Sequence, residues 1–160
     1  MTEYQLRGNR VTPMQEEEIA SIAMGFFYEF GLSNVPTNRL DIIFEKLGEY
    51  PTISLDILTD KRWEKETKNL TNGHFDHSTG TIRVPQRIYM KACKGEKEQL
   101  FIMLHELGHL FLGHKPVLHN SHIPPKRNED AEWQADTFAN IILEQLGYID
   151  MQLSFDFDGM

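Results

Sequence analysis

Residues 100–114 read LFIMLHELGHLFLGH, and this stretch decides the fold because apolar side chains cover nearly every side of the helix that it predicts. The helix is expected to run from about Glu96 to Gly113. A helix that is apolar all round is buried among the other elements of its domain. The polar side chains of His105, Glu106 and His109 are therefore expected to be buried too, and buried polar groups need partners.

A metal ion bound by the pentapeptide HELGH would be such a partner. Residues four apart share one face of a helix, so the imidazoles of His105 and His109 can bind the same tetrahedral ion. Glu106 then remains beside the ion as a free carboxylate, which is the position of a general base. Chance produces this pattern in roughly 3% of shuffled chains of this composition. The pentapeptide alone therefore leaves open a helix that carries two histidines without a metal.

A catalytic metal site also needs a third protein ligand and one open position. The segment EDAEWQADTFAN, residues 129–140, offers Glu132 and Asp136 on a helix predicted from about Asn128 to about Gly147. Glu132 is the expected third ligand, and Asp136 is expected to accept the free ring N–H of a ligating histidine. An acidic first turn at the positive end of the helix dipole is an alternative explanation for Glu132. It does not account for Asp136, which lies one turn further along.

The remaining patterns predict an α+β fold with one domain and a small sheet. Apolar residues spaced by three and four predict a helix that ends near Phe30, with Thr12 and Gln15 as its capping residues. Alternation from Thr52 predicts a strand, and turn residues at 78–80 predict an antiparallel hairpin. The other expected elements are helices at about 37–47 and 86–94, a strand at 52–57, and hairpin strands at 73–76 and 81–84.

Composition and charge restrict the class of protein. The chain has 160 residues, 40% hydrophobic and 25% charged, as expected for one folded domain. We expect that domain over residues 1–150 and a C-terminal tail over 151–160. The formal net charge of −8 argues against direct binding of nucleic acid. We expect a protein that does not cross a membrane, because its apolar segments are too short to span a bilayer. We also expect it to be cytoplasmic, because it has a single cysteine and no secretion-type start.

HELGHLFLGH at 105–114, followed by EWQADTFA at 132–139, resembles the ImmA/IrrE family of zinc metallopeptidases, which are associated with repressors of phages and mobile elements. The resemblance extends from the first helix to about Leu143 and includes the strand TIRVP. It implies a zincin-like, gluzincin-type fold in which the small sheet packs against the HExxH helix. The sequence departs from the usual family pattern after Phe138, where it reads ANIILEQLGY.

The resemblance also implies a site and a substrate. Zinc would be held by His105, His109 and Glu132, and Glu106 would be the catalytic base. Asp136 would hydrogen-bond to one of the ligands without touching the zinc. The implied substrate is a helix-turn-helix repressor, cleaved at one site. Two alternatives remain open, namely a binding module of the same fold that sequesters a regulator without cutting it, and a structural zinc protein.

Strand 81–84 is expected to form the rim of the cleft and to pair with the substrate backbone. Peptide hydrolysis usually also needs a hydrogen-bond donor for the developing oxyanion. The sequence does not choose among the donors. His114 can instead cap its helix or, like His122, close a structural metal site as a fourth ligand. The candidate oxyanion or substrate-contacting residues are His77, Tyr89, His114, His119 and His122.

Overall fold

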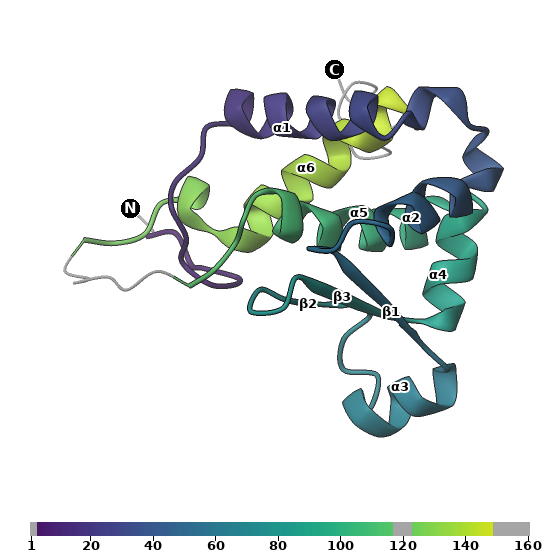
Figure 1. Ribbon diagram of the computed structural model, residues 1–160. Coiled ribbons are helices and arrows are strands. Elements are labelled where there is room, and N and C mark those ends of the chain that lie inside the picture. The colour runs from purple at the N-terminus through teal and green to yellow at the C-terminus, as the bar shows by residue number, and fades with distance from the viewer. Residues whose placement is uncertain (1–2, 117–122, 149–160) are drawn as a thin grey trace, which may run out of the picture.

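Helices surround a short sheet in the computed structural model, which describes residues 3–116 and 123–148 (Figure 1). The helices in these ranges are α1 (Glu16–Glu29), α2 (Asp41–Leu47), α3 (Asp60–Thr67), α4 (Gln86–Cys93), α5 (Lys97–Phe111) and α6 (Ala131–Gln145). The strands are β1 (Ser54–Leu58), β2 (His74–Asp76) and β3 (Thr81–Pro85). Three 3-10 turns, η1 (Leu32–Asn34), η2 (Thr37–Arg39) and η3 (Arg127–Glu129), complete the elements. This arrangement confirms the expected small α+β fold.

The sheet is mixed, with strand order β1-β3-β2. β2 and β3 form the predicted antiparallel hairpin, and Gly80 supplies the positive φ of 67° that its turn requires. β1 runs parallel to β3, which the local alternation did not indicate. Because β3 lies between two strands, its backbone has no free edge, and the expectation that it pairs with a substrate is wrong. β2 is the edge strand on the side of the hairpin.

The HELGH helix α5 lies at the centre, with α6 and α4 packed against it and the sheet below it in the view of Figure 1. Gly108 allows α6 to come close. A Cβ atom at this position would lie 3.1 Å from the Cα of Ala135, so any side chain would press on the backbone of α6. The close crossing brings the polar faces of α5 and α6 together, and both predicted halves of the metal site lie on these faces.

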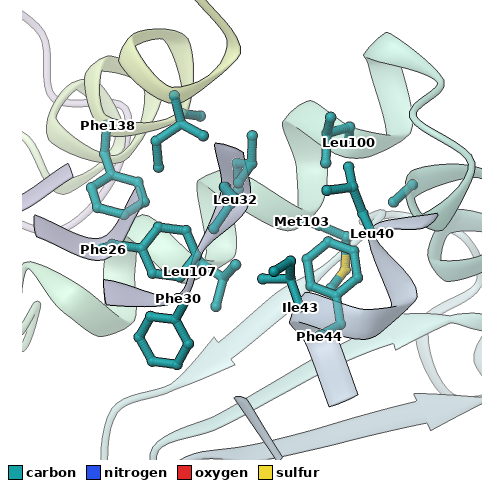
Figure 2. Packing of buried hydrophobic residues seen from close by; sticks show 14 of the residues in the cluster. Phe26, Phe30, Leu32, Leu40, Ile43, Phe44, Leu100, Met103, Leu107 and Phe138 are labelled. Atoms are coloured by element: carbon teal, nitrogen blue, oxygen red, sulfur yellow. The ribbon is translucent and has the colours of Figure 1, made fainter. Parts of the chain in front are cut away.

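Aromatic and aliphatic side chains from α1, α2, α5 and α6 form the core (Figure 2). The rings of Phe26 and Phe111 are 4.9 Å apart, and Phe111 stacks on Phe138 at 6.2 Å. Phe138 is fully buried, and removing a buried ring of this size typically costs about 3–5 kcal/mol. The core thus fixes α1 and α6 on one side of the HELGH helix.

Several boundaries differ from the predicted ones. α1 begins at Glu16 with Gln15 as N-cap, and the Glu18 carboxylate accepts the Gln15 backbone N–H at 3.3 Å, so Thr12 is not a capping residue. The expected helix at 37–47 is split into η2 and α2. α3 was not predicted, because Trp63 is its one buried residue and eight residues give little periodicity. The expected C-terminal tail at 151–160 lies outside the described residues.

In the ranges 3–116 and 123–148 no helix combines the length and the apolar character that crossing a bilayer requires.

Candidate metal centre

α5 and α6 bring three ligand atoms to one point. The Nε2 atoms of His105 and His109 are 3.1 Å apart, and the Glu132 carboxylate oxygens lie 2.7 Å and 3.4 Å from them. All three residues offer a ligand atom within 4.8 Å of the others. Two imidazole nitrogens and one carboxylate oxygen match the donor set of a metal ion with an open coordination position.

His105 is held from behind by Asp136. Its Nδ1–H donates to Asp136 Oδ1 at 2.7 Å, and Arg7 donates to the other carboxylate oxygen at 2.8 Å. Burial opposes ionisation of Asp136, but the hydrogen bonds from His105 and Arg7 outweigh it and lower its pKa. Burial alone would lower the pKa of His105, yet its hydrogen bonds with Asp136 and Glu132 raise it to about 10. A cation, whether proton or metal, is thus strongly favoured at Nε2.

His109 is held by a second imidazole. Its Nδ1 lies 2.8 Å from Nδ1 of His114, and the Nε2 of His114 lies 2.6 Å from Oε1 of Gln134. Burial lowers the pKa of His114 to about 4, although its bond to Gln134 opposes the shift, so this ring is neutral at pH 7. Both nitrogens of His114 are engaged, which leaves none for a metal. The structure therefore places His114 behind a ligand rather than in the fourth coordination position.

The convergence of lone pairs shows that these residues fit a metal. The Nε2 atoms of His105 and His109 and the carboxylate oxygens of Glu132 all face one point, so that their lone pairs are directed at one another. Such an arrangement is repulsive unless a cation lies between the three groups. Phe75 stacks on the ring of His109 at 6.2 Å and covers it on the side of the sheet.

Glu106 lies beside these ligands in a nearly dry position. It is 6% exposed, and burial raises the pKa of its carboxyl group against the opposing effect of the two histidines. Gly73 packs directly on it, because a Cβ atom there would lie 3.1 Å from Glu106 Cγ. A carboxyl group with a raised pKa, fixed next to a metal site, is suited to accept and return a proton.

A cleft of about 320 Å³ opens onto Glu106, His109 and Glu132. The segment that leads into β2 forms one wall, and the N-terminal residues Asn9 and Val11 contribute to another. Of the predicted oxyanion and substrate residues, His77 and His114 line this cleft. Tyr89 does not; it lies on α4 with its ring 5.9 Å from Phe44. His119 and His122 lie outside the described residues.

The N-terminal segment, residues 4–12, is a part of the site that sequence patterns did not reveal. It is attached to the start of α6 through Asp130, whose carboxylate accepts the Tyr4 hydroxyl at 2.6 Å and the Arg7 backbone N–H at 2.9 Å. Gly8 packs against Glu132, and a Cβ atom at Gly8 would lie 2.7 Å from Glu132 Cγ. Arg7 and Gly8 belong to no recognisable motif, and Gln134, although it lies within EWQADTFA, was not singled out because its partners become adjacent only after folding.

Comparison with known proteins agrees with this geometry. The model of the Peptidase_M78 family, described as the IrrE N-terminal-like domain, matches residues 63–144, which include all three metal-site residues and Glu106. No curated protein and no solved structure matches the chain. The match covers slightly more than half of the sequence, and the chain therefore belongs to the Peptidase_M78 family of metallopeptidases, as an IrrE N-terminal-like domain.

Proposed function

We propose that this protein is a zinc-dependent endopeptidase that cleaves a helix-turn-helix transcriptional repressor of a phage or mobile element. The observation that carries the proposal is the buried Glu106 next to three converging metal ligands in an open cleft. Family membership supports peptide hydrolysis as the reaction. The repressor as substrate rests on the sequence resemblance to ImmA/IrrE proteins.

In the proposed reaction His105, His109 and Glu132 hold the zinc ion. A bound zinc ion supplies Lewis acidity, which polarises a carbonyl group and activates water for attack. The Glu106 carboxylate accepts the proton of the attacking water and then delivers it to the leaving amine. Burial favours this exchange, because the raised pKa of Glu106 brings the carboxyl group closer to the working pH.

The edge strand β2 is the proposed place for the substrate backbone. No other strand of the described ranges pairs with its outer edge, and the segment around it lines the cleft. An extended peptide added at this edge would gain main-chain hydrogen bonds and would pass the metal centre. His77 lines the same cleft and is the proposed contact for the oxyanion or the substrate.

Charge supports a basic substrate. The formal net charge of the chain is −8. DNA-binding domains carry positive surfaces, and opposite charges increase the rate at which two proteins meet. Association with a repressor is therefore expected to weaken as the salt concentration rises.

Cleavage of a candidate repressor tests the proposal. The zinc-loaded protein is incubated with the repressor encoded next to its gene, and fragments are identified by mass spectrometry. Glu106→Gln should lower the cleavage rate roughly a hundredfold or more while zinc remains bound. Glu17→Gln, the same change at an exposed site on α1, is the matched control and should cleave normally. Equal cleavage by both variants, or repressor inactivation without any cleavage, would contradict the proposal; the second result would favour a sequestering module.

A further inference from the structure

We infer that His114, oriented by Gln134, is a positioning residue that fixes His109 in the one tautomer able to bind the metal through Nε2. The inference concerns the metal site on which the proposed function rests.

Two backbone carbonyls fix the orientation of the Gln134 side chain. Its side chain is fully buried, and its amide nitrogen donates to two backbone carbonyls, those of Thr12 at 2.9 Å and Asn128 at 2.8 Å. Carbonyl oxygens only accept, so the NH₂ group must face them. The amide oxygen, Oε1, is therefore the atom that faces His114.

The amide oxygen of Gln134 determines the tautomer of His114. An amide oxygen accepts, so the 2.6 Å contact requires that His114 donates through Nε2–H. A neutral imidazole with its proton on Nε2 has a lone pair on Nδ1. That lone pair accepts the Nδ1–H of His109 across 2.8 Å, and the Nε2 of His109 is left as the donor to the metal.

The end of α5 explains how two residues so close in sequence can meet in this way. Gly113 adopts a left-handed conformation with φ of 67°, and the backbone N–H of His114 donates to the carbonyl of His109 at 3.0 Å. The N–H of Gly113 donates to the carbonyl of Leu110 at 3.1 Å. This pair of bonds is the Schellman motif, which turns the chain back over the last helical turn. The motif brings the ring of His114 next to the ring of His109.

The two histidine ligands are thus supported differently. His105 donates to the negatively charged Asp136, whereas His109 donates to a neutral imidazole that is 7% exposed. A neutral support orients the ring without adding a further charge to the buried site. Loss of such a support typically weakens metal binding about 10- to 100-fold.

Two nearly isosteric substitutions separate positioning from packing. His114→Asn puts a carbonyl oxygen where Nδ1 of the histidine lies and retains an acceptor for His109. His114→Leu has almost the same shape and no acceptor. Zinc affinity, measured by competition with a chelating indicator, should fall about 10- to 100-fold in His114→Leu and less than about threefold in His114→Asn. Equal losses of zinc affinity in both variants would show that His114 contributes only packing. Unchanged affinity in both would show that His114 has no role in metal binding.

A second measurement on the unaltered protein keeps the inference testable if a variant does not fold. Nitrogen NMR of the zinc-loaded protein, with histidines labelled, reports the tautomer of each ring. The inference requires a proton on Nε2 of His114 and on Nδ1 of His109; a proton on Nδ1 of His114 would overturn it. Neither readout depends on cleavage. If the protein bound zinc as described and cut no repressor, the proposed function would fail and this inference would stand.

Discussion

At the level of single residues, the two carboxylates on one face of α6, Glu132 and Asp136, make different contacts. Glu132 contacts both imidazoles directly, and its hydrogen bonds with His105 and His109 hold its pKa well below the usual range. Asp136 contacts the far side of His105 and is itself bound by Arg7. The spacing ExxxD thus places Glu132 where it could bind a metal and Asp136 where it orients His105.

Asp136→Asn should weaken zinc binding roughly tenfold without removing it. The amide oxygen can still accept the Nδ1–H of His105, but the negative charge that strengthens this ligand is lost. Chelator competition would measure the change. Asp56→Asn, on β1 away from the metal centre, is the matched control; an equal effect of the two variants would contradict the assigned role of Asp136.

The pKa of His105, raised to about 10, makes the stability of the zinc-free protein depend on pH. Because the folded pKa is higher than the unfolded value of about 6.5, protonated His105 stabilises the fold fully below that value. This contribution is lost as pH rises from about 6.5 to about 10. Urea unfolding in the presence of a chelator at several pH values should therefore show a declining free energy of unfolding, and the decline should be smaller in His105→Gln. A free energy that rises over this range would contradict the assignment.

At the level of elements, the metal site depends on how closely α5 and α6 approach each other. Gly108→Ala would place a methyl group 3.1 Å from the backbone of Ala135. We expect a loss of about 1–3 kcal/mol of stability from overpacking, together with weaker zinc binding, because the ligands come from both helices. Gly25→Ala on α1 is the control, since nothing lies within 4 Å of the added methyl group. It should stabilise the protein by up to about 1 kcal/mol, and thermal unfolding would distinguish the two.

The start of α6 is a second sensitive element. Asp130 is fully buried; it caps the helix by accepting the Glu132 N–H at 3.0 Å and also binds Tyr4 and Arg7 of the N-terminal segment. Asp130→Ala should cost about 3 kcal/mol, since a helix cap and buried hydrogen bonds to a charged group are lost together. Chemical denaturation would measure this. A change below about 1 kcal/mol would show that the N-terminal segment contributes little to holding α6 in place.

At the level of the whole molecule, local periodicity predicted most helices and the hairpin, because these elements depend on neighbours in sequence. The parallel pairing of β1 with β3 joins segments that α3 separates, and no local pattern encodes it. The candidate metal ligands could be chosen from the sequence for the same local reason, since the residues of HELGH and of ExxxD each lie on one helix face, and the structure brings these two faces together. The roles of Arg7 and Gln134 could not be predicted, because Arg7 binds Asp136 and Gln134 binds Thr12 and His114, partners that become adjacent only after folding.

The most direct test of the central claim is anomalous diffraction at the zinc absorption edge, measured on crystals of the zinc-loaded protein. A single strong peak is expected between the Nε2 atoms of His105 and His109 and the carboxylate of Glu132, with His114 behind His109 and outside the coordination shell. A zinc peak within bonding distance of His114, or the absence of any peak at these three residues, would contradict the account.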